Sequence, residues 1–125
     1  QEIEYNRGIA TCLGSLGNLA TKRNDNKKAV EYYLESLEAN EESGNTGGVS
    51  LTLHRLGQIH FNMNDLDKAE EYYEKCRVLN RDIEDHKNES KAIAKLVKIA
   101  KIKGDHSKAK ILEAERKRTW DLSNS

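Results

Sequence analysis

Histidine and cysteine, the side chains that most often bind metals or act as bases and nucleophiles, are spaced unfavourably for either task in this chain. His54 and His60 are six residues apart, so they do not share a helical face as an i, i+4 metal-binding pair does. Cys12 and Cys76 are far apart, and neither belongs to a Cys-x-x-Cys pair. The sequence has no His-Glu-x-x-His motif, phosphate-binding glycine loop or Gly-x-Ser-x-Gly turn. We therefore expect no enzymatic activity, no metal and no cofactor, with His60 and Cys76 packed in the interior.

Charged side chains are numerous and unevenly distributed along the chain. The 21 basic and 21 acidic residues cancel, but residues 1–47 carry a net charge of −3, residues 48–87 carry −2 and residues 88–125 carry +5. Lys91, Lys95 and Lys98 recur at i, i+4 and i+7, which places them on one face of a helix. This stripe is either a solvated surface or a surface that attracts carboxylates on a ligand.

The element that must position these side chains is an internal repeat. Ala29, Ala69 and Ala109 recur at equal intervals of forty positions, each in a similar local sequence. Apolar residues within each repeat recur at steps of three and four, so each repeat is expected to be a pair of amphipathic helices. Six helices are predicted, at about residues 5–22, 26–42, 48–63, 66–84, 89–103 and 106–120.

The turns within the repeats also follow a common pattern. Asn24, Asn64 and Gly104 are residue types that accept a left-handed backbone at the end of a helix. Each is followed by an aspartate that can cap the next helix, namely Asp25, Asp65 and Asp105. Residues 41–47 and 82–86 are expected to be polar linkers between repeats.

With Leu16-Gly17-x-x-Ala20 before Ala29 and Tyr33, and Leu56-Gly57-x-x-His60 before Ala69 and Tyr73, the chain resembles the tetratricopeptide repeat family. The 40-residue period is similar to repeats of kinesin light chains, spindle-orientation scaffolds and prokaryotic regulators. The resemblance implies an all-α fold, a right-handed superhelix of three helix-turn-helix units at about 8–47, 48–87 and 88–122. The whole chain, 1–125, would form a single domain taken from a longer array. The third unit departs from the pattern, since Val97 replaces the glycine and Glu113 replaces the tyrosine.

In this family the first helices of successive repeats line a concave groove that holds an extended peptide. The resemblance therefore assigns twelve residues to such a groove: Thr11, Ser15, Asn18, Lys22, His54, Arg55, Gln58, Asn62, Lys91, Lys95, Lys98 and Lys101. Amide side chains can pair with the backbone of a peptide, and the basic side chains favour acidic residues on it.

The expected function is thus a non-catalytic protein-interaction module or scaffold that binds an acidic or mixed peptide. Self-assembly, head to tail or as a dimer, is an alternative, because the end helices would expose apolar faces. Nucleic-acid binding through the basic third unit is disfavoured, because aromatic residues do not alternate with the basic ones there. No apolar run is long enough to span a bilayer, and the sequence begins without a signal-peptide pattern, so a cytoplasmic protein without a membrane partner is expected.

Overall fold

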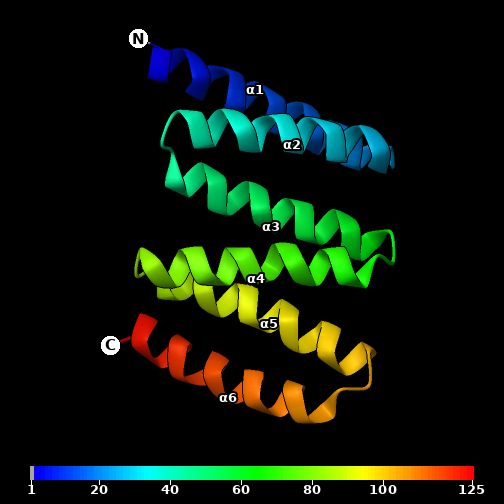
Figure 1. Ribbon diagram of the computed structural model, residues 1–125, viewed down its shortest axis with the longest axis vertical. Helices are drawn as coiled ribbons and strands as arrows, with labels where there is room; N and C mark the ends of the chain where they lie inside the picture. The colour runs from blue at the N-terminus through cyan, green and yellow to red at the C-terminus, as the bar shows by residue number, and fades with distance from the viewer. Residues whose placement is uncertain (1) are drawn as a thin grey trace. The chain divides into compact units, whose positions relative to one another are not determined.

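The computed structural model describes residues 2–125, and all of its regular secondary structure is helical. The six helices are α1 (Glu2–Lys22), α2 (Asn26–Glu42), α3 (Thr46–Asn62), α4 (Leu66–Asp82), α5 (His86–Ile102) and α6 (His106–Ser123) (Figure 1). The predicted all-α fold of six helices in sequential pairs is confirmed.

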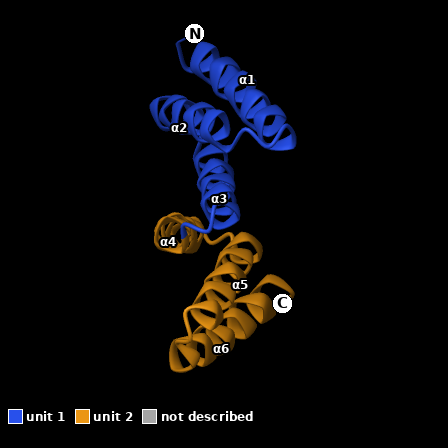
Figure 2. Cartoon of the chain, turned by 90° about the vertical axis from the view of Figure 1, so that its right-hand side faces the viewer, with its two compact units in different colours: residues 1–65 blue, residues 66–125 orange. Residues whose placement is uncertain are grey.

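The chain divides into two compact units, one of residues 1–65 and one of residues 66–125 (Figure 2). In the first unit α2 packs against both α1 and α3, and in the second unit α5 packs against both α4 and α6. The boundary falls between the two helices of the second repeat, a division that the repeat pattern did not predict. The prediction of a single domain, in which three repeats act together, stays a prediction.

Each helix joins the next through a three-residue turn of the same construction. The second residue of each turn has a positive φ, and these residues are Asn24, Gly44, Asn64, Glu84 and Gly104. Its neighbour donates a backbone hydrogen bond to a carbonyl five residues earlier, as Asp25 does to Ala20 (2.9 Å), and this bond closes the end of the helix.

The third residue of four of these turns caps the following helix. The side chains of Asp25, Asn45, Asp85 and Asp105 each accept a hydrogen bond from the backbone N–H three residues later. Side-chain capping of this kind satisfies N–H groups that have no partner inside the helix.

Two predicted linkers are much shorter than expected. The polar composition of residues 41–47 and 82–86 predicts linkers there, but α2 and α4 continue through Glu42 and Asp82, while α3 and α5 begin at Thr46 and His86. The turn rule explains the difference, because Gly44-Asn45 and Glu84-Asp85 occupy the same two positions as Asn24-Asp25.

Small residues bring the paired helices together. Ala29, Ala69 and Ala109 are buried, as the repeat pattern predicts. A Cβ atom added to Gly17 would lie 2.4 Å from the Tyr33 ring, so only glycine permits this approach of α1 to α2. Tyr33 and Tyr73 are core residues, and burial raises the pKa of the Tyr73 hydroxyl.

Candidate peptide-binding site

The first unit contains a cavity of about 400 Å³ between α1, α2 and the start of α3. Its lining combines polar side chains with three glycines. The lining residues are Ala10, Thr11, Gly14, Ser15, Asn18, Ser36, Asn40, Asn45, Gly47, Gly48, Leu51, Thr52 and Arg55.

The buried polar groups of the cavity bond to one another and to the backbone. Ser36 donates to the carbonyl of Ala10 (2.9 Å), and Asn40 donates to the hydroxyl of Thr52 (3.4 Å). Asn45 in turn donates to Oδ1 of Asn40 (3.2 Å). Because their partners are within the protein, these groups fix the shape of the cavity.

Glycine is required where α3 passes this network. A Cβ atom added to Gly48 would lie 2.3 Å from Oδ1 of Asn40, so a larger residue would displace the Asn40 amide. The local sequence Asn45-Thr46-Gly47-Gly48 therefore both caps α3 and leaves room for the amide beneath it.

Three other cavity residues offer hydrogen-bond donors. The hydroxyl of Tyr33 donates to Oδ1 of Asn18 (2.6 Å), which leaves the Asn18 NH₂ group as its available donor. The Arg55 guanidinium lies over Gly14, where an added Cβ atom would be 3.5 Å from its nitrogen. Within residues 2–125 Arg55 has no hydrogen-bond or ion-pair partner, and neither does the hydroxyl of Ser15. Asn18, Arg55 and Ser15 together suit a ligand that supplies acceptors, above all a carboxylate.

The structure brings together only some of the sequence-predicted groove residues. Thr11, Ser15, Asn18 and Arg55 line the cavity, with the Thr11 hydroxyl donating to the carbonyl of Arg7 (3.0 Å). The other four in this unit lie outside it: Lys22 is exposed at the end of α1, His54 is half-buried on α3, and Gln58 donates to Asn62 (2.9 Å).

The four lysines assigned to the groove lie on α5, in the second unit. Lys91, Lys98 and Lys101 are exposed, and Lys95 is half-buried. They form a basic face on that helix, and its role in binding stays a prediction.

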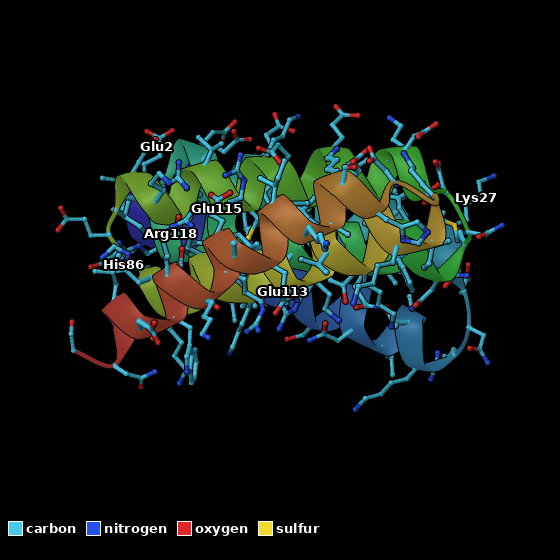
Figure 3. All side chains as sticks on the ribbon, turned by 90° about the horizontal axis from the view of Figure 1, so that it is seen from below. Glu2, Lys27, His86, Glu113, Glu115 and Arg118 are labelled. Carbon is cyan, nitrogen blue, oxygen red and sulfur yellow. The ribbon has the colours of Figure 1, made fainter. Side chains whose placement is uncertain are left out.

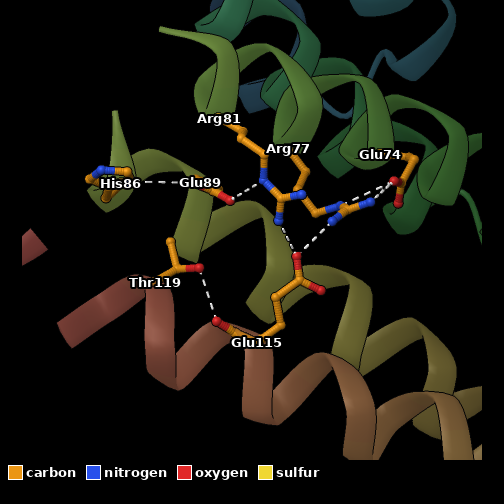
Figure 4. Close-up of polar contacts among 7 residues, drawn as sticks. All are labelled: Glu74, Arg77, Arg81, His86, Glu89, Glu115 and Thr119. Carbon is orange, nitrogen blue, oxygen red and sulfur yellow. Dashed lines mark hydrogen bonds and ion pairs between the residues drawn. The ribbon is translucent and has the colours of Figure 1, made fainter. Parts of the chain in front are cut away.

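Another polar cluster in the second unit joins α4, α5 and α6 (Figure 4). Arg77 donates to Glu115 (2.7 Å) and also pairs with Glu74, while Arg81 donates to the buried Glu89 (2.9 Å) and also pairs with Glu115. The carboxylates beside them raise the pKa of both guanidinium groups, Glu74 acting most on Arg77 and Glu89 most on Arg81. These charges are paired within the protein, so we assign the cluster to the packing of the unit.

A second ion-pair group connects the start of α4 to the turn between α5 and α6 and to the first turn of α6. Lys103 donates to Asp67 (2.6 Å) and Glu70 (3.0 Å), and Lys108 donates to Glu70 (2.7 Å). The hydrogen bond from Lys108 lowers the pKa of the Glu70 carboxyl, and that from Lys103 lowers the pKa of Asp67. Elsewhere, charged side chains extend from the outer surfaces of the helices (Figure 3).

Several other sequence predictions concern chemistry and membranes. His60 is buried, with Nδ1 3.7 Å from Oδ2 of Asp65, and Cys76 is buried, as expected from the sequence. Among the described residues, no group of three or more His, Cys, Asp or Glu side chains is arranged to hold a metal ion. No described helix combines the length and the apolar character that crossing a bilayer requires.

Comparisons with known proteins identify the class of this helical repeat. Two family models described as tetratricopeptide repeat match the chain, one over residues 9–43 and the other over residues 50–83. Together they cover more than half of its 125 residues. The chain belongs to the tetratricopeptide repeat family, and the resemblance inferred from its sequence is confirmed. Repeats of this family are generally protein–protein interaction modules.

Solved structures with low sequence identity have the same fold. BtubC (BKLC) from P. vanneervenii is 22% identical with a TM-score of 0.84, and the match covers 93% of this chain and 48% of that one. Aspartyl phosphate phosphatase F from Bacillus subtilis is 12% identical with a TM-score of 0.90, and the match covers 97% of this chain and 32% of that one. The chain thus spans about half the length of the first protein and a third of the second. No curated protein matches its sequence.

Sequence reasoning missed the buried part of the cavity. Ser36, Asn40 and Asn45 were not among the candidate residues, because the groove was inferred from the first helix of each repeat alone. One available signal was the recurrence of Asn40 at Asn80, one repeat later, in a segment otherwise rich in charge. A second signal was the 20-residue spacing of the turns, which identifies Asn45 as a helix cap.

Proposed function

We propose that this chain is a non-catalytic interaction module that binds an extended peptide through the cavity of its first unit, with Arg55 holding an acidic residue of that peptide. The observation that carries the proposal is the Arg55 guanidinium, which lies in a polar cavity without an acidic partner among residues 2–125. A carboxylate from a ligand would form charge-assisted hydrogen bonds with it, worth about 1.5–3 kcal/mol.

The neighbouring groups supply the contacts that a peptide backbone needs. Asn18 lines the same cavity, and its NH₂ group can donate to a peptide carbonyl, while the Ser15 hydroxyl can donate or accept. The backbone around Gly47 and Gly48 leaves space for a chain to approach closely. The bound peptide would thus be recognised by its backbone and by one carboxylate.

A peptide-display selection on the purified chain, followed by fluorescence anisotropy, tests this function. We expect the selected peptides to contain Asp or Glu, and Arg55→Gln to weaken their binding by about ten- to a hundredfold. Arg7→Gln is the matched control, because Arg7 is an exposed arginine of α1 outside the cavity. Equal loss of affinity in both variants, or none in either, would contradict the role of Arg55.

The chemical form of the carboxylate can be established with the same peptides. Amidating the C-terminus removes the terminal carboxylate, and replacing each internal Asp or Glu by its amide removes one side-chain carboxylate. We expect only one of these changes to weaken binding, by about tenfold. This corresponds to about 1.4 kcal/mol for one lost contact.

A cytoplasmic location accords with this function. Cys12 and Cys76 are both present as thiols, as is usual in a reducing compartment.

A further inference from the structure

Helix α1 carries an apolar stripe that its own unit leaves partly exposed. The stripe consists of Tyr5, Ile9, Cys12, Leu16 and Leu19, at steps of four and three, and Arg23 in the turn after α1 continues the spacing. We call these six residues the α1 seam. Tyr5 is 69% exposed, Leu16 41% and Leu19 43%. The seam lies on a different side of the helix from Ala10, Gly14, Gly17 and Ala20, the buried residues of α1.

Three of the positions equivalent to the seam are buried in both later repeats. The residues equivalent to Cys12, Leu16 and Leu19 are Thr52, Leu56 and Ile59 in α3, and Ala92, Leu96 and Ile99 in α5. All six are at most 3% exposed, and they lie on helices that pack against the preceding helices α2 and α4. A helix therefore covers this surface wherever the structure contains a preceding neighbour, and the seam of α1 is suited to the same kind of partner.

The start of α1 differs from that of every later helix. Counting back by the 20-residue spacing, Ile3, Glu4 and Tyr5 occupy the positions of the three-residue turn. These residues are helical instead, so α1 begins an extra turn earlier, at Glu2. Glu4 and Tyr5 thus belong to α1 itself, and the ring of Tyr5 adds to the exposed side of the helix.

We propose that the α1 seam is a homodimer interface, in which two copies of this chain pack α1 against α1 in antiparallel orientation. Steps of four and three sustained from Tyr5 to Arg23 are the spacing of a coiled-coil seam. Charge decides the direction, because the first turn of α1 contains Glu2 and Glu4, and its opposite end has Lys22 and Arg23. Antiparallel helices place the acidic end of one copy beside the basic end of the other, whereas parallel helices would place like charges together.

The pairing also fixes which residues meet. With the centre of the seam between Cys12 and Leu16, Ile9 of one copy lies opposite Leu19 of the other, and Cys12 lies opposite Leu16. Tyr5 then faces Arg23, a pair that can form a cation–π contact.

Head-to-tail stacking of copies is less favourable for an identifiable reason. Suppose that α6 of one copy covered α1 of another copy as α4 covers α5. Lys110 and Arg23 would then occupy the positions of Glu70 and Lys103, and two like charges would replace that ion pair. The Arg81–Glu89 ion pair would be replaced by Asp121 and Ile9, which do not attract each other.

Sedimentation velocity over a concentration series tests the dimer. Because the contact uses one helix from each copy, it falls among small interfaces, and we expect a dissociation constant on the order of 10 µM. Leu16→Glu should raise that constant at least about tenfold, since it places a charge in the seam. Leu34→Glu is the matched control, because Leu34 is 43% exposed on α2, away from the seam, and should leave the constant unchanged.

Disulfide trapping tests the orientation. In a Cys12→Ser background, Ile9→Cys and Leu19→Cys chains mixed with oxidised glutathione should give the mixed disulfide dimer. The Ile9→Cys chain alone should form little disulfide dimer, because the two introduced thiols would lie about 15 Å apart along the antiparallel helices. A monomer at all concentrations, oligomers larger than a dimer, or Ile9→Cys disulfides formed as readily as mixed ones would each overturn the proposal.

This interface is independent of the peptide site. Arg55→Gln should weaken peptide binding without changing dimerisation, and Leu16→Glu should do the reverse, since the seam and the cavity residues Thr11, Ser15 and Asn18 lie on different sides of α1. Failure of either proposal can therefore be recognised without affecting the other.

Discussion

The turn residues show how single positions determine where each helix ends. Five of the described residues have a positive φ, between 58° and 78°. Four of them are Asn or Gly, the residue types that adopt this conformation at lowest cost, and the fifth is Glu84. Glu84 has a Cβ atom and lacks the short amide of asparagine, so its left-handed conformation is strained.

We predict that Glu84→Gly stabilises the protein. Relief of the left-handed strain should exceed the extra entropy that glycine gives the unfolded chain, for a net gain of about 0.5–1 kcal/mol in the free energy of unfolding. Urea denaturation of both proteins measures this difference. Glu38→Gly is the control, because Glu38 is exposed inside α2 and the same change there should destabilise by a similar amount. A loss of stability from Glu84→Gly would contradict the argument.

At the scale of the elements, contact between paired helices depends on matched volumes. In the first pair Gly17 leaves room for the Tyr33 ring, and both residues are buried. In the pair formed by α5 and α6 the equivalent residues are Val97, which is buried, and Glu113, which is partly exposed. The third repeat therefore has neither the glycine nor the tyrosine, and a buried valine stands at the position of the glycine.

We predict that Gly17→Ala destabilises the protein, although alanine is the better helix former. The added Cβ atom would lie 2.4 Å from the Tyr33 ring, and overpacking of this kind costs about 1–3 kcal/mol. With Tyr33→Ala already present, the same change should be neutral or stabilising by up to about 1 kcal/mol. A double-mutant cycle measured by urea denaturation gives the coupling. Additive effects of the two changes would show that this contact is not the cause.

The sequence was sufficient for the elements because their signals are local. Helix ends were predicted within three residues of their positions, and Asn24, Asn64 and Gly104 adopt the expected backbone. The predicted starts of α3 and α5, residues 48 and 89, lie after the observed starts at Thr46 and His86, because the polar composition around Asn45 and Asp85 indicates a linker. The extra turn at the start of α1 was missed as well, since no cap precedes Tyr5.

The site was less predictable because it depends on packing between helices. Thr11, Ser15, Asn18 and Arg55 were expected to face the same groove, and all four line the cavity. The network of Asn40, Asn45 and Thr52 arises from the approach of α2 to α3, which no local pattern in the sequence specifies. The division between residues 65 and 66 likewise depends on which helices pack most closely.

At the scale of the whole molecule, each compact unit has its own core. The first unit buries Leu53, Leu56 and Ile59, while the second buries Ile93, Leu96 and Ile99. Charge divides in the same way, since residues 1–65 carry a net −3 and residues 66–125 carry a net +3. In a repeat protein, stability is the sum of local contributions. A substitution that destabilises one core therefore need not destabilise the other core to the same extent.

We predict that Ile93→Ala loosens the second unit more than the first. Removing a fully buried isoleucine costs about 2–5 kcal/mol, and hydrogen exchange measured by mass spectrometry should accelerate most in α4, α5 and α6. Ile111→Ala, at a site that is 68% exposed in the same unit, should leave the exchange rates nearly unchanged. Equal acceleration in α1 and α2 would show that the two cores unfold as one.

The regular turns have a consequence for how such a chain can grow. Seventeen helical residues and three turn residues recur from Asn26 to Asp105, so every turn offers an equivalent point for recombination. A duplication of two successive helices with their turns, beginning at any turn, would preserve both the caps and the alternation of first and second helices. A duplication of one helix and its turn would preserve the caps but place a second helix where a first helix belongs. Gene duplications that leave this fold intact are therefore restricted to multiples of the full period.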